Sequence, residues 1–148
     1  MNQRIYGRAI VAGAAGIAVK DLILQGAVAL GWARYNLWAV LAQRYSLAPT
    51  AGFLSQAVVG LSLHVAIGVM WALLWAGVLR TGCFANFGWV MLGLANTVVI
   101  WMGWGITFPL LRLGPAPWSL GFSTTIITLF SDLGYSLVTA RGLTRVSV

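Results

Sequence analysis

The sequence is poor in charged residues and in the residue types that build catalytic and metal sites. Only 7% of its 148 residues are charged, against about 25% in a typical soluble domain. Asp21 and Asp132 are its only acidic residues, His64 its only histidine and Cys83 its only cysteine. A single cysteine excludes an intrachain disulfide, and no Cys/His pair or carboxylate cluster with metal-ligand spacing is present. We therefore expect no enzymatic activity, no bound metal and no cofactor.

Apolar residues, by contrast, are abundant. Hydrophobic residues make up 60% of the chain, which also contains 18 glycines and eight tryptophans. Glycine is more frequent in membrane helices than in soluble ones, and tryptophan is enriched at the membrane interface. This composition indicates an integral membrane protein with a single membrane domain over residues 1–148.

Four apolar runs are long enough to cross a bilayer. A hydrocarbon core about 30 Å thick needs roughly 20 apolar residues in a helix, and backbone polar groups in lipid must be satisfied within the spanning segment. Charges at Lys20 and Asp21 interrupt the first run, so we expect it to be retained as a span and not removed as a signal peptide. The sequence predicts an all-α integral membrane protein with four transmembrane helices, at about residues 9–30, 53–79, 87–111 and 118–140.

The connection between the first two spans predicts a short interfacial helix at about residues 33–45. Aromatic and apolar residues recur there at helical spacing, and two arginines offer charge to lipid headgroups. These residues are Arg34, Tyr35, Trp38, Leu41, Arg44 and Tyr45.

The basic residues predict the orientation of the chain. The N-terminus, the second connection and the C-terminus carry five arginines, and the opposite side carries three, so the positive-inside rule places both termini in the cytoplasm. The five are Arg4, Arg8, Arg80, Arg141 and Arg145, and the three are Arg34, Arg44 and Arg112. Because these cations are scattered between apolar runs, we expect membrane lipids as partners and no nucleic acid.

The eight tryptophans divide into two groups. Trp32, Trp38, Trp89 and Trp118 lie near predicted interfaces, where we expect them to act as anchors. For Trp71, Trp75, Trp101 and Trp104, which lie deeper, we expect lipid contact or packing between subunits. A stacked cofactor or quinone-like ligand is the alternative.

Both acidic residues and the only lysine lie within predicted spans, where charge is costly. Lys20 and Asp21 are adjacent, and adjacent side chains on a helix point about 100° apart, so at least one should reach another helix. Asp132 is the candidate partner of Lys20, because it lies on a polar stripe of the last span and the first and last spans run antiparallel. Asp21 would then bond to Asn96, a hydroxyl or water. A neighbour of Asp21 or another subunit is the alternative partner of Lys20.

These polar residues support two hypotheses. The first is a proton, ion or small-solute pathway formed by Lys20, Asp21, His64, Asn96, Thr128 and Asp132. In that case the two carboxylates titrate, Lys20 provides the countercharge and His64 relays protons. The second is a structural or accessory subunit, in which the charges fix helix neighbours within a homo-oligomer or a larger membrane complex. His64 also allows a weaker third hypothesis, an axial ligand to haem or chlorophyll.

The chain resembles the YagU-like group of small bacterial inner-membrane proteins, whose activity is largely unassigned. The resemblance rests on Val19-Lys20, on His64, on Phe108-Pro109-Leu110 and on the proline-bearing stretch 113–118. It implies four spans and a bacterial inner-membrane location. The last span of that group carries an acidic residue and a histidine one turn apart, where this chain has Thr128 and Asp132.

Overall fold

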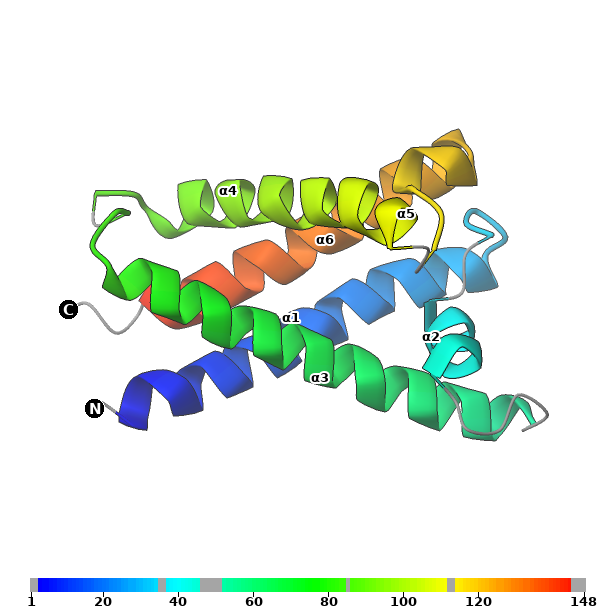
Figure 1. Cartoon of the computed structure of the whole chain (residues 1–148), viewed down its shortest axis with the longest axis horizontal. Coiled ribbons are helices and arrows are strands. Elements are labelled where there is room, and N and C mark those ends of the chain that lie inside the picture. Colours follow the sequence, from blue (N-terminus) through cyan, green and yellow to red (C-terminus); the bar gives the residue numbers. More distant parts are fainter. Residues whose placement is uncertain (1–2, 35–36, 46–51, 85, 112–113, 145–148) are drawn as a thin grey trace.

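The computed structural model describes residues 3–34, 37–45, 52–84, 86–111 and 114–144, and every element in these ranges is helical (Figure 1). The all-α prediction is therefore confirmed for the described part of the chain. The long helices are α1 (Gln3–Ala29), α3 (Phe53–Arg80), α6 (Phe122–Thr144) and a continuous stretch of α4 (Trp89–Met102), the π-helix η1 (Gly103–Thr107) and α5 (Phe108–Leu110). Two short helices, α2 (Leu37–Tyr45) and η2 (Pro117–Leu120), lie in the connections.

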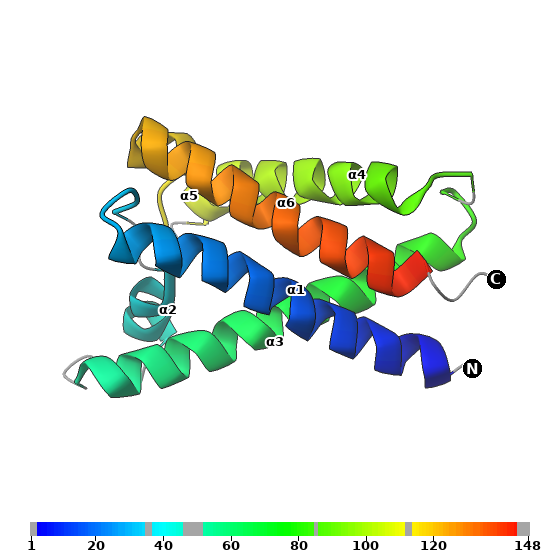
Figure 2. The ribbon, with the colours of Figure 1, turned by 180° about the vertical axis from the view of Figure 1, so that it is seen from behind.

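The long helices pack in the order α3, α1, α6, α4. Helix α1 contacts both α3 and α6, while α4 packs on α6 and α2 packs on α3. Helices α1 and α6 run antiparallel, which leaves both ends of the chain on the same side of the bundle (Figure 2). Helices α3 and α4 are close at the connection that joins them and diverge toward α2 and α5 (Figure 1).

Glycines with positive φ end two of the long helices. Gly31, after α1, has a φ of 74°, and Gly82, after α3, has a φ of 78°. This left-handed conformation carries no steric penalty for glycine and is a common way to terminate a helix. After α1, the backbone N–H of Trp32 donates to the Ala27 carbonyl at 2.8 Å, which satisfies one of the carbonyls left open at the helix end.

Among the described residues, three helices are long and apolar enough to cross a membrane. They cover Arg4–Ala29, Ala57–Arg80 and Trp89–Leu110, and correspond to the first three predicted spans. Helix α6 has 23 residues and lies over the fourth predicted span. Its many hydroxyl groups and Asp132 lower its mean hydropathy, and most of these polar side chains are turned into the bundle, where they are buried.

Small residues let α1 pack closely between α3 and α6. A Cβ added to Gly13 would lie 2.9 Å from Ala72 Cβ and Val69 Cα of α3, and one added to Gly16 would lie 2.6 Å from Thr139 Oγ1 of α6. Real side chains do not approach so closely. Membrane helices commonly use small residues to bring two backbones together, and here both contacts lie within one chain.

The predicted interfacial segment contains a helix, α2, that packs on α3. Leu41 and Ala42 are buried, and the Trp38 backbone lies directly against Gly60 of α3. This apolar face is therefore covered by the chain itself. Tyr35 lies outside the described residues, as do the side chains of Arg44 and Tyr45.

Candidate functional site

Lys20 and Asp132 form a buried ion pair between α1 and α6. The Nζ of Lys20 lies 2.5 Å from Oδ1 of Asp132, and the Asp132 side chain is fully buried. The predicted partner of Lys20 is thus confirmed. The ammonium also lies 5.6 Å from the ring centroid of Trp104, within the distance of a cation–π interaction.

Asp21 contacts His64 of α3. Its Oδ1 lies 2.8 Å from Nδ1 of the imidazole, and both side chains are more than nine-tenths buried. Neither Asp21 oxygen accepts a hydrogen bond of normal geometry from a described residue. The prediction that Asp21 bonds to Asn96 is wrong. Asp21 points toward His64 of α3, whereas Asn96 lies on α4. Lys20 and Asp21 thus link α1 to two different helices.

Asn96 instead joins its own helix, α4, to two other helices. Its side-chain oxygen accepts a hydrogen bond from Trp71 Nε1 of α3 at 2.8 Å, and its Nδ2 donates to Ser136 Oγ of α6 at 3.3 Å. Asn96 itself lies on α4 and is fully buried. The amide is therefore a bridge within the bundle, separate from the charged groups.

Thr128 bonds within its own helix and not to the charged groups. Its hydroxyl donates to the Thr125 carbonyl of the same helix at 2.9 Å, and that of Ser131 donates to the Thr128 carbonyl at 2.8 Å. Such bonds satisfy a buried hydroxyl within its own helix. The structure thus brings together Lys20, Asp21, His64 and Asp132, which we call the polar cluster, and leaves Asn96 and Thr128 outside it.

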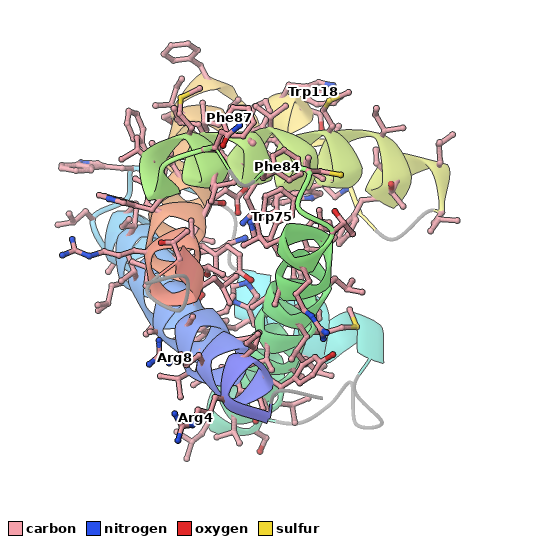
Figure 3. All side chains as sticks on the ribbon, turned by 90° about the vertical axis from the view of Figure 1, so that its left-hand side faces the viewer. Arg4, Arg8, Trp75, Phe84, Phe87 and Trp118 are labelled. Atoms are coloured by element: carbon pink, nitrogen blue, oxygen red, sulfur yellow. The ribbon has the colours of Figure 1, made fainter. Side chains whose placement is uncertain are left out.

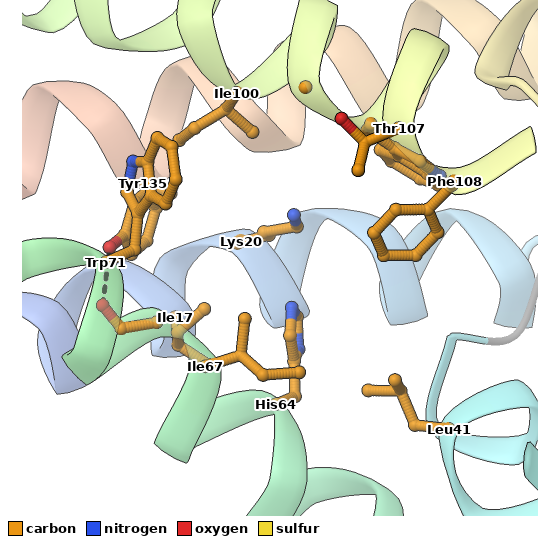
Figure 4. Close-up of a pocket in the computed structure, with 13 residues that line it drawn as sticks. Ile17, Lys20, Leu41, His64, Ile67, Trp71, Ile100, Thr107, Phe108 and Tyr135 are labelled. Carbon is orange, nitrogen blue, oxygen red and sulfur yellow. Dashed lines mark hydrogen bonds between the residues drawn. The ribbon is translucent and has the colours of Figure 1, made fainter. Parts of the chain in front are cut away.

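The polar cluster adjoins a cavity of about 270 Å³ between α3 and the α4–η1–α5 stretch (Figure 4). Lys20, His64 and Tyr135 are its charged or titratable lining residues, and the His64 ring is directed toward Lys20 in Figure 4. The carboxylates of Asp21 and Asp132 do not line it. The other lining residues are mainly aliphatic and aromatic: Ile17, Leu41, Ile67, Gly68, Trp71, Ile100, Gly103, Trp104, Thr107 and Phe108.

Tyr135 and the π-helix shape this cavity. The Tyr135 hydroxyl donates to the Gly68 carbonyl at 2.6 Å and so holds α6 to α3 at one edge (Figure 4). At the other edge η1 contributes Gly103, Trp104 and Thr107. Single π-turns within α-helices occur frequently at functional sites. Sequence reasoning missed both features, although the placement of Tyr135 three residues after Asp132 was a usable signal for the first.

The deeper tryptophans pack inside the chain more than we expected. Trp75 and Trp104 are buried, with 6% and 7% of their surface exposed, so the prediction of lipid or subunit contact is wrong for both. Trp75 packs against Phe84, which in turn contacts Phe87, and this aromatic group fills the space where α3 meets α4 (Figure 3). Of the predicted anchors, Trp32, Trp89 and Trp118 are exposed and Trp38 is half-buried.

Three arginines gather around a groove between α1 and α6 at the end of the bundle that carries both termini. Arg4, Arg8 and Arg141 line it, together with glycine, alanine and valine residues. Arg4 and Arg8 extend outward from α1 in Figure 3, and Arg141 lies 5.4 Å from the Trp89 ring. Arg112 and Arg145, which also entered the orientation count, lie outside the described residues.

No group of three or more His, Cys, Asp or Glu residues that could hold a metal ion occurs in the described ranges. Comparison of the chain with protein-family models, curated proteins and solved structures finds no match. The site must therefore be interpreted from its own chemistry. It combines a buried ion pair, a carboxylate facing an imidazole and a largely apolar cavity.

Proposed function

We propose that this chain is a four-span membrane protein in which the polar cluster serves as a site for proton or small-solute movement. The observation that supports this proposal is the number of charges in the cluster. With Lys20, Asp21 and Asp132 ionised and His64 neutral, the formal charges of +1, −1 and −1 leave a net charge of −1. A net charge inside a membrane bundle is costly. One proton, held by the imidazole or by a carboxyl group, makes the cluster neutral.

The contacts within the cluster divide the roles of its members. Asp132 and Lys20 neutralise each other at 2.5 Å, so this pair anchors the site. Asp21 and His64 lie 2.8 Å apart, and they differ from that pair because the imidazole carries a charge only when it is protonated. We assign the exchangeable proton to Asp21 and His64. Imidazole is suited to this role, since its unperturbed pKa of about 6.5 lies near neutral pH.

Helix α6 completes the proposed bundle as the fourth span. Most of its polar side chains lie on the side packed against α1 and α4 and are buried, among them Thr128, Ser131, Asp132 and Ser136. A helix whose polar face is covered by its neighbours can cross a bilayer in spite of a modest mean hydropathy. We place the protein in the bacterial inner membrane with both termini in the cytoplasm, in keeping with the arginine count and the YagU-like resemblance.

The test is proton flux into liposomes that contain the purified protein and a pH-sensitive dye, driven by a potassium diffusion potential. Wild type should acidify the lumen faster than empty liposomes, and Asp21→Asn should reduce the rate to that of empty liposomes. Ser131→Ala is the matched control, because its buried hydroxyl bonds only within α6 in the described structure. Equal rates for wild type and Asp21→Asn, with both folded, would refute the proton assignment.

A structural or accessory role is the second candidate. It is favoured by the complete burial of Asp132 and by bonds that tie helices together, including the Asn96 bridge. In that role the chain would assemble as a homo-oligomer or within a larger complex. Native purification in a mild detergent distinguishes the two. Persistent co-purification of another complex, together with no flux from the isolated chain, would favour the accessory role.

A further inference from the structure

We propose that the cavity beside the polar cluster binds a neutral, mostly apolar ligand that carries a flat ring and a carbonyl oxygen. The inference rests on the lining of the cavity and not on proton movement, so it holds or fails independently of the flux experiment. The chemistry of the ligand is restricted by four features of the cavity: its volume, its walls, its polar groups and its opening.

The volume sets the size of the ligand. An engineered cavity of about 150 Å³ accommodates benzene, so 270 Å³ leaves room for two fused rings. This volume is close to the lower end, about 300 Å³, of small-molecule sites in proteins. A large lipid would not fit as a whole.

The walls favour a flat aromatic or quinone-like ring. Trp71 of α3, Trp104 of η1, Phe108 of α5 and Tyr135 of α6 line the cavity from different helices (Figure 4). Aromatic side chains stack on flat rings with a preference for offset or edge-to-face geometry. Trp104 and Phe108 already contact each other, with centroids 6.1 Å apart.

The polar lining favours a neutral ligand with a hydrogen-bond acceptor. The Lys20 ammonium has three N–H donors, and its described hydrogen bond goes to Asp132 alone. Because Asp132 neutralises the ammonium, no anionic ligand is needed to balance the charge of Lys20. The nearby carboxylate of Asp21 would repel an anionic ligand. A carbonyl oxygen would accept a hydrogen bond from Lys20 without adding charge.

The opening of the cavity indicates entry from the bilayer. Ile67 on α3 and Thr107 on η1 line it and are exposed, so the cavity is open between these two helices. Both lie within helices long and apolar enough to cross a membrane. Ile67 lies near the middle of its helix, so in the proposed four-span topology its surroundings are hydrocarbon, from which an apolar ligand enters readily.

The test measures equilibrium binding of menadione to the protein in lipid nanodiscs, with the uptake of empty nanodiscs subtracted. Saturable binding of one molecule per chain is expected. Methylnaphthalene, which lacks the carbonyl groups, should bind about tenfold more weakly, as expected for one lost hydrogen bond. Binding that rises linearly, without saturation above the empty nanodiscs, would overturn the proposal.

Gly103→Leu fills the cavity and Gly77→Leu is its matched control. A Cβ added at either glycine meets no atom within 4 Å, and only Gly103 lines the cavity. Gly103→Leu should weaken menadione binding at least tenfold while Gly77→Leu leaves it unchanged, with Gly103→Ala as a milder variant if the leucine variant does not fold. Unchanged binding in folded Gly103→Leu would place the ligand elsewhere. Equal affinity for methylnaphthalene, or tighter binding of an octanoate anion, would refute the neutral carbonyl ligand.

Discussion

Lys20 on α1 and Asp132 on α6 are 112 positions apart in the sequence and meet at 2.5 Å in the interior of the bundle. The contact joins the first and last long helices, which run antiparallel (Figure 2). It places the only lysine of the chain against one of its two carboxylates. The lysine is thus neutralised within the bundle, and the second carboxylate, Asp21, is left to His64.

This pairing predicts strong coupling between the two residues. Lys20→Met or Asp132→Leu alone leaves a buried charge without its partner, and each should lower the free energy of unfolding by about 3–5 kcal/mol. The double variant removes both charges and should recover most of that loss. Equilibrium unfolding in mixed micelles of a mild detergent and sodium dodecyl sulfate measures the four species. A double variant whose loss equals the sum of the single losses would show that the two groups do not interact.

The packing of α1 on α6 predicts opposite outcomes for two glycine substitutions in the same helix. An added Cβ at Gly16 would lie 2.6 Å from Thr139 Oγ1 and 2.7 Å from Tyr135 Cδ2, while one at Gly26 meets nothing within 4 Å. Gly16→Ala should therefore destabilise the fold by about 1–3 kcal/mol, and Gly26→Ala should not destabilise it. Thermal unfolding in detergent, followed by circular dichroism, measures both. Equal melting temperatures for the two variants would contradict the close contact.

The lone cysteine provides a test of orientation. Cys83 is exposed in the connection between α3 and α4, which the positive-inside rule places in the cytoplasm. A membrane-impermeant maleimide should therefore label it in permeabilised cells and not in intact spheroplasts. In a Cys83→Ser background, Ser119→Cys on η2 is the matched control at the opposite end, where it should be labelled without permeabilisation. The reverse pattern would invert the proposed topology.

The arginine groove between α1 and α6 predicts a preference for anionic lipids. Each of Arg4, Arg8 and Arg141 should contribute about 1 kcal/mol of attraction to an anionic headgroup, so each Arg→Gln change should weaken phosphatidylglycerol binding about fivefold. Arg80→Gln is the control, because Arg80 bonds Tyr6 at 3.1 Å and does not line the groove. Native mass spectrometry measures bound lipid. Equal retention of phosphatidylglycerol and phosphatidylcholine by wild type would contradict the prediction.

Much of the helical pattern could be predicted from the sequence. The apolar run predicted at residues 53–79 is α3 (Phe53–Arg80), and the run at 87–111 is the stretch from Trp89 to Leu110. Long apolar segments are a strong signal because the bilayer fixes their length. The predicted last span begins and ends four residues before α6, because Pro117–Leu120 form the separate helix η2 and α6 continues past Arg141 to Thr144.

The partners of the polar residues were harder to predict. The Lys20–Asp132 pair followed from the antiparallel order of the helices, but the choice between Asn96 and His64 for Asp21 depends on the rotation of α1 about its axis. A helix that is apolar on all sides contains little information about that rotation. The π-helix at Gly103–Thr107, which shapes the cavity, depends on a local change in hydrogen bonding that residue spacing did not reveal.

The central claim is that the polar cluster holds one exchangeable proton. Because His64 is the only histidine, nitrogen-15 labelling of histidine in a chain purified without a polyhistidine tag reports on it alone. Its imidazole faces Asp21 and lies near Lys20, Asp132 and Tyr135, the neighbouring titratable groups on α1 and α6. Solid-state NMR in bilayers should detect both the imidazolium and the neutral imidazole between about pH 5 and pH 9. A single protonation state across that whole range would contradict the assignment of the exchangeable proton to Asp21 and His64.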